Sequence, residues 1–138
     1  MGYTHYTRGY LMLHDDFLAD VQKIIDASDA VIRGWDGTGE PTVSNAEIRL
    51  NGDAFEDLDH ETFVLVDGVN HSTFCKTARK PYDEVVTAIL LRATFYSKRF
   101  KVSSDGDFEN DWKDGRELYA RVFGEDAAMP SEVTAVYA

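Results

Sequence analysis

Hydrophobic and polar positions alternate along several short segments of the chain, and this period of two predicts β-strands. The longest alternation runs from Tyr3 to Leu13 and includes several aromatic residues. Asn51-Gly52 and Asp67-Gly68 are turn-forming pairs that predict the ends of two strands. The expected strands cover residues 3–13, 31–35, 46–50, 62–66 and 100–103.

Three other segments place apolar residues three and four positions apart, which is the spacing of an α-helix with one buried face. The first helix is expected to begin at Asp15 or Asp16 and to end near Ala30. The second begins with Pro81 and ends near Ser97, and its wide apolar face predicts a central position. The third is expected over residues 112–123, before Gly124.

The resulting order is β-α-β-β-β-α-β-α, which predicts an α+β fold with a mixed or mostly antiparallel sheet and about three helices. A chain of 138 residues is expected to form a single domain, which we place at residues 1–124. Pro130 and several small residues follow Glu125, so residues 125–138 are expected to form a mobile C-terminal tail.

Charge and composition narrow the expected location and partners. The formal net charge is -11, which argues against non-specific nucleic-acid binding because that needs a broad cationic face. One cysteine, Cys75, allows no intrachain disulfide and is typical of a reducing compartment. No segment has the pattern of a signal peptide or a membrane span. We therefore expect a cytoplasmic protein without a membrane partner.

The segment 74–83, Phe-Cys-Lys-Thr-Ala-Arg-Lys-Pro-Tyr-Asp, places three cations within five residues, at the expected start of the second helix. A helix N-terminus exposes unpaired N–H groups and a partial positive charge, which favour an anion. The polar side chains that would bind or border a phosphate or carboxylate here are Lys76, Thr77, Arg79, Lys80 and Asp83. The alternative is that these cations pair with the protein's own carboxylates.

Two further segments contribute candidate ligand-binding residues. On the first strand Tyr3 and His5 share one face, where they could contact a base or sugar, or simply pack under a helix. Ser104 and Asp105 lie in the turn that is expected over residues 104–107. The histidines show no zinc-ligand spacing and the acidic segment 105–116 departs from the EF-hand pattern, so we predict no metal and no cofactor. A looser cation site formed by Asp105, Asp107 and Glu109 is the alternative. We assign no catalytic residue.

The segments Gly2-Tyr3-Thr4-His5-Tyr6 and 74–83, together with Asp36-Gly37-Thr38-Gly39 and 102–106, resemble an uncharacterised family of small proteins encoded by bacteriophages. The resemblance extends from Gly2 to about Trp112. It implies a phage origin and expression in the cytoplasm of a bacterial host, and it carries no known activity.

The sequence therefore leads to one hypothesis and two alternatives. The hypothesis is a phage accessory protein that binds a small anionic, nucleotide-like ligand without catalysis, at a site where the three segments converge. The first alternative is a protein-interaction or virion-associated protein that uses its acidic surface to bind, for example, a host protein. The second alternative is a metal-assisted phosphoester hydrolase that uses His5 or His71 with Asp105.

Overall fold

The computed structural model describes residues 3–137, so that Met1, Gly2 of the N-terminal motif and Ala138 lie outside the described part. The strands are β1 (Thr4–Leu11), β2 (Thr42–Val43), β3 (Glu47–Leu50), β4 (Phe63–Val66), β5 (Val69–Lys76) and β6 (Lys101–Ser104). The helices are α1 (Asp15–Ala27), α2 (Asp83–Tyr96) and α3 (Lys113–Phe123), with a short 3-10 turn over Ala54–Glu56. Within these residues the strands form two antiparallel three-stranded sheets, ordered β5-β1-β6 and β2-β3-β4. The predicted α+β class is confirmed.

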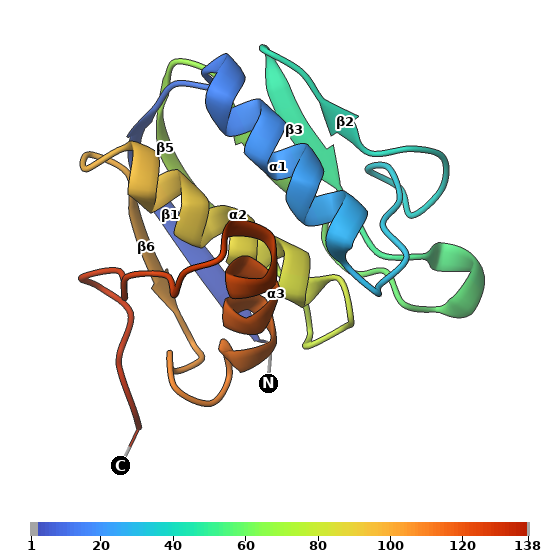
Figure 1. Ribbon diagram of the computed structural model, residues 1–138. Coiled ribbons are helices and arrows are strands. Elements are labelled where there is room, and N and C mark those ends of the chain that lie inside the picture. Colours follow the sequence, from blue (N-terminus) through green and yellow to red (C-terminus); the bar gives the residue numbers. More distant parts are fainter. Residues whose placement is uncertain (1–2, 138) are drawn as a thin grey trace.

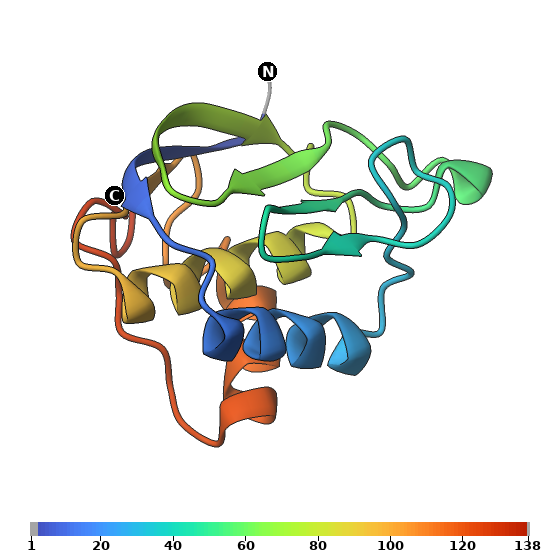
Figure 2. The same ribbon diagram turned by 90° about the horizontal axis from the view of Figure 1, so that it is seen from above.

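The three helices lie on one side of the strands, as the two views show (Figures 1 and 2). Helix α2 is central because the strands cover it on one side and α1 and α3 pack on its other sides. All its residues from Val85 to Leu91 are buried, as are Phe17, Val21 and Ile24 of α1. The core therefore lies between the sheets and the helices, and within residues 3–137 no helix covers the opposite face of either sheet.

The prediction of a strand at residues 31–35 was wrong, because only an isolated bridge between Arg33 and Asn51 forms there. Asn51-Gly52 does not close a hairpin either. The Asn51 side chain instead donates to the carbonyl oxygens of Trp35 at 3.1 Å and His60 at 3.0 Å, and it fixes the long loop between β3 and β4. A polar side chain that is 3% exposed thus serves as an anchor rather than as a turn residue.

Helix α2 begins at Asp83 rather than at Pro81. The chain before it forms two successive turns, in which the Lys80 N–H donates to the Thr77 carbonyl at 3.0 Å and the Asp83 N–H donates to the Lys80 carbonyl at 2.9 Å. Pro81 lies within the second turn, so it directs the chain into the helix without being part of it.

Residues 125–137, predicted to form a tail outside the domain, pack against the body. Val133 is 3% exposed. The backbone N–H groups of Phe108 and Glu109 donate to the carbonyls of Thr134 and Ala135 at 2.8 and 2.9 Å. Among the described residues no helix combines the length and the apolar character that crossing a membrane requires.

Candidate functional site

Three distant segments of the chain meet at His5, whose ring is buried beneath the sheet formed by β5, β1 and β6. Its Nε2 lies 2.6 Å from Oδ1 of Asp83, the first residue of α2. Its Nδ1 lies 2.8 Å from Oγ of Ser104, at the end of β6. The Trp112 ring packs edge-on against the imidazole at 5.3 Å. The sequence-based grouping of His5, Asp83 and Ser104 is thus realised in space.

The hydrogen-bond partners fix the direction of each bond in this cluster. Ser104 Oγ accepts from the Trp112 indole N–H at 3.1 Å and from the Gly106 backbone N–H at 3.0 Å. Both acceptor positions of the hydroxyl are then used, so its own proton must be donated to His5 Nδ1. The Nε2–H of His5 therefore donates to Asp83, which also accepts from the Thr77 hydroxyl at 2.6 Å.

The serine, histidine and carboxylate resemble a hydrolytic triad in their distances, but the chemistry differs. A nucleophilic oxygen needs a free lone pair directed at the substrate. In Ser104 both lone pairs are engaged by Trp112 and Gly106. The cluster is therefore a structural network that joins β1, β6 and the start of α2, and it positions the residues around it.

The loop that leads into α2 is strained beside this network. Ala78 and Arg79 have φ values of +53° and +58°, which side chains other than glycine seldom adopt. With the bond from Lys80 to Thr77, they form a tight turn of type I′. The turn brings the Arg79 guanidinium to 4.0 Å from the centre of the Tyr3 ring and its Nη1 to 2.5 Å from Asp111 Oδ1.

We expect Ala78→Gly to raise the free energy of unfolding by about 0.5–1 kcal/mol, because glycine adopts the left-handed conformation without the steric cost. Urea denaturation measures the change. Ala46→Gly serves as the control, since Ala46 is exposed and is not among the residues with positive φ, and it should lower stability. Equal losses at both positions would mean that the turn stores no strain.

A cavity of about 460 Å³ opens next to this turn. It is lined by Tyr3, Arg79, Lys80, Pro81, Asp83, Glu84, Asn110, Asp111 and Asp114. The Tyr3 hydroxyl is buried and has no hydrogen-bond partner within residues 3–137. Burial raises the pKa of this phenol above its ordinary value, and the charges of Asp83 and Asp111 raise it further. The hydroxyl therefore stays protonated at neutral pH.

The cavity includes some of the predicted site residues and excludes others. Tyr3, Arg79, Lys80 and Asp83 line it, whereas His5, Thr77 and Ser104 support it through the network. Two predicted residues contribute elsewhere. The Lys76 ammonium lies 5.7 Å from the centre of the Phe74 ring, and the Asp105 carboxylate accepts from Thr4 N at 3.1 Å and from the Tyr6 hydroxyl at 3.2 Å.

Sequence reasoning missed the acidic side of the cavity, which consists of Glu84, Asp111 and Asp114 together with Asn110. Burial raises the pKa of Glu84, and a hydrogen bond from Ser28 at 2.8 Å opposes that change. The acidic segment near residue 110 is visible in the sequence. Its position opposite Arg79 depends on tertiary packing, and no local pattern signals it.

Cys75 and His71 do not form a reactive pair. Cys75 is 5% exposed, and burial raises the pKa of its thiol to about 12, with the nearby Glu61 and Asp83 carboxylates adding to the effect. The thiol is therefore protonated at neutral pH. His71 instead lies 3.2 Å from both the Gly9 carbonyl oxygen and the Val66 nitrogen.

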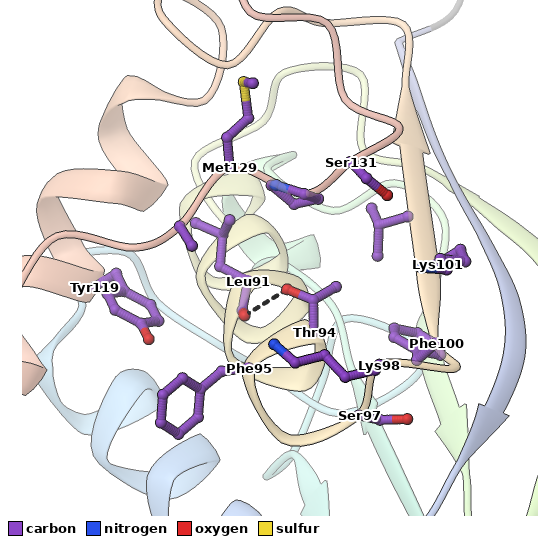
Figure 3. Close-up of a pocket in the computed structure, with 13 residues that line it drawn as sticks. Leu91, Thr94, Phe95, Ser97, Lys98, Phe100, Lys101, Tyr119, Met129 and Ser131 are labelled. Carbon is purple, nitrogen blue, oxygen red and sulfur yellow. Dashed lines mark hydrogen bonds between the residues drawn. The ribbon is translucent and has the colours of Figure 1, made fainter.

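Two other cavities offer less chemistry. One of about 500 Å³ separates β4 from β5 and is lined mainly by the strands themselves. The other, of about 240 Å³, lies between the end of α2 and the C-terminal segment near Met129 (Figure 3). Its Thr94 hydroxyl donates to the Leu91 carbonyl at 2.8 Å and is already satisfied (Figure 3). Within residues 3–137 no three or more His, Cys, Asp or Glu side chains are grouped so that they could hold a metal ion.

Comparison with known proteins adds no functional assignment. The chain matches no family model, no curated protein and no solved structure. The resemblance to phage-encoded proteins, and the origin and location that it implies, therefore stay predictions. The function has to be argued from the cavity and from the surfaces of the molecule.

Proposed function

We propose that this protein is a non-enzymatic binding module for a small polar ligand that carries a positive charge, and that the ligand occupies the cavity beside Tyr3. The observation that supports this proposal is the lining of the cavity. Four carboxylates face two cations there, and Tyr3 also lines the cavity. A volume of about 460 Å³ suits a small organic molecule.

The carboxylates favour an amine or a guanidinium as the charged group of the ligand. Asp114 is exposed, and within residues 3–137 its side chain makes no hydrogen bond or ion pair, so its carboxylate oxygens are available. Lys80 keeps its charge, because its ammonium donates to the neutral Asp57 carbonyl oxygen at 2.9 Å, but the four carboxylates of the lining outnumber the two cations. Arg79 is neutralised by Asp111. The potential inside the cavity is therefore negative, which attracts a cation.

The sequence-based hypothesis of a nucleotide-like anion receives less support from the same geometry. The first N–H groups of α2 are already used, because those of Asp83, Glu84 and Val85 donate to Lys80, Pro81 and Tyr82. A phosphate would also have to displace Asp111 from Arg79. Nucleotides and phosphate therefore enter the experiment as the competing ligand class.

The test is thermal unfolding of the purified protein with spermidine, putrescine, agmatine, arginine, ATP, cyclic AMP and phosphate. A ligand at about 100 times its dissociation constant adds about 2.7 kcal/mol to the free energy of unfolding, which raises the melting temperature visibly. We expect amines or guanidinium compounds to give the shift. Asp114→Asn should weaken their binding roughly tenfold, since it removes a charged acceptor.

Asp126→Asn is the matched control, because Asp126 is exposed, does not line the cavity, and loses the same charge. Its effect on the dissociation constant should be small. A shift with nucleotides or phosphate that Arg79→Gln abolishes would favour the anionic ligand instead. If none of these compounds raises the melting temperature, the proposal of a small-ligand site is wrong.

A further inference from the structure

In the described part of the chain no helix covers the outer face of the sheet β5-β1-β6, because the three helices α1, α2 and α3 pack on its other side (Figure 2). Side chains alternate between the two faces of each strand. On β1, His5 and Thr7 therefore point toward the core, and Tyr6, Arg8 and Tyr10 are exposed on the outer face. This outer face is distinct from the cavity beside Tyr3.

Two aromatic residues occupy opposite positions on neighbouring strands of this face. Tyr6 of β1 is directly opposite Phe74 of β5 in the antiparallel register. Their exposed fractions are 42% and 56%, with Tyr6 on the central strand and Phe74 on the edge strand β5. Tyr10, 40% exposed, extends the aromatic surface along β1. Flat aromatic side chains on neighbouring strands form a platform on which planar rings can stack.

The charge of the same face is opposite to that of the whole protein. The strands β1, β5 and β6 contain no aspartate or glutamate, although the chain has 25 acidic residues. Their cations are Arg8, Lys76 and Lys101, and Arg8 lies opposite Lys101 in the register. Lys76 lies 5.7 Å from the centre of the Phe74 ring. Cations thus border the aromatic platform.

A shallow hollow of about 280 Å³ joins these two features. Its lining includes Tyr6 and Phe74 as well as Arg8, Lys101 and Ser103. Three opposing carboxylates are contributed from outside the three strands. Glu132 pairs with Arg8, Asp105 accepts from the Tyr6 hydroxyl, and Glu61 accepts from the Lys76 backbone N–H at 2.9 Å. A base stacked on Tyr6 or Phe74 would bring its phosphate within the range of these cations.

We propose that this face binds a short stretch of single-stranded nucleic acid through base stacking on Tyr6 and Phe74 and phosphate contacts to Lys76 and Lys101, whereas Arg8 is paired with Glu132. Stacking on aromatic residues with flanking cations is the chemistry by which proteins bind unpaired strands. The net charge of -11 predicts weak non-specific binding to duplexes. It does not exclude a local site, because charges more than about 10 Å away are largely screened at 0.1 M salt.

Fluorescence anisotropy with labelled dT15, rU15 and a duplex of equal length, at 50 mM salt, tests the proposal. We expect binding to the single strands and weaker binding to the duplex. Tyr6→Ala and Phe74→Ala should each weaken binding about tenfold or more. Lys101→Gln should reduce the salt dependence of the affinity, because it removes one phosphate contact.

Phe55→Ala and Lys23→Gln are the matched controls. Phe55 is 76% exposed but lies on the 3-10 turn, and the Lys23 side chain is 65% exposed on α1. Neither should change the affinity. The proposal is overturned if no oligonucleotide binds, if the duplex binds as tightly as the single strands, or if Phe55→Ala weakens binding as much as Phe74→Ala. Self-association that Phe74→Ala abolishes, without oligonucleotide binding, would also overturn it and would indicate a second copy of the chain as the partner.

Discussion

Asp83→Ala is expected to lower the free energy of unfolding by about 3–5 kcal/mol, since two buried donors would lose their common acceptor. The donors are Nε2–H of His5 and the Thr77 hydroxyl, and both side chains are at most 1% exposed. Each buried group left without a partner costs about 1–3 kcal/mol. The loss of a carboxylate at the start of α2 adds up to about 1 kcal/mol. Urea denaturation followed by circular dichroism measures the total.

Two variants separate the contribution of the buried hydrogen-bond network to the free energy of unfolding from the contribution of the helix dipole. Asp83→Asn retains an oxygen acceptor for His5 and Thr77, so we expect a loss of only about 1 kcal/mol. Asp16→Ala removes an exposed acidic residue from the first turn of α1 and should show the dipole effect alone. If Asp83→Ala costs no more than Asp16→Ala, the buried network does not hold the three segments together.

The helices and most strands were predictable because their patterns are local. Helix α1 buries one set of residues spaced three or four apart, namely Phe17, Val21 and Ile24, whereas α2 has a wide apolar surface and is buried on all sides from Val85 to Leu91. The strand β5 was not predicted. Its outer side is polar apart from Phe74, and on its inner side only His71 and Cys75 are buried, so no alternation marks it. A strand defined by its partner β1 rather than by its own hydrophobicity has no local signal.

The candidate site was predictable in part. The residues His5, Asp83 and Ser104 were selected from three segments, and the structure joins them because β1 pairs with β6 in the register that places His5 opposite Ser104. That register is a tertiary property. The sequence-based prediction gave too much weight to the cations of segment 76–80. The carboxylates that face them, those of Asp111 and Asp114, come from the loop before α3 and from the start of α3, which are far from this segment in the sequence.

The sequence of segment 74–83 does not reveal its backbone conformation or its backbone hydrogen bonds. A helix start was expected to offer free N–H groups, but the turn from Thr77 to Lys80 and the bonds that follow it use those of Asp83, Glu84 and Val85. Two left-handed residues in succession cannot be inferred from Ala78 and Arg79, because neither favours that conformation. The occupied N–H groups leave little to bind an anion, and the left-handed turn brings Arg79 to Asp111. Both features make the cavity more favourable for a cation than for an anion.

Gly115→Ala is expected to lower the free energy of unfolding by about 2–4 kcal/mol, although alanine favours helix over glycine by about 1 kcal/mol. Gly115 is buried where α3 crosses α2. An added Cβ would lie 1.8 Å from the Thr87 hydroxyl oxygen, 2.8 Å from its Cβ and 3.2 Å from the Glu84 carbonyl oxygen. Thr87 is itself fully buried, so the helices must separate. Urea denaturation gives the change.

Whether Gly115→Ala raises or lowers the free energy of unfolding shows whether helix propensity or packing dominates at this position. A double-mutant cycle with Thr87 tests whether Thr87 is the contact responsible. At an exposed helical position the same substitution would stabilise the protein, so a gain in stability would show that α2 and α3 do not pack this closely. Thr87→Ala removes the nearest atom but leaves Cβ, so the double variant should recover part of the loss.

Gly39→Ala is the backbone control, because its φ is +65° and nothing lies within 4 Å of the added Cβ. It should cost about 1 kcal/mol from conformation alone, and any larger loss at Gly115 measures the steric conflict between the two helices.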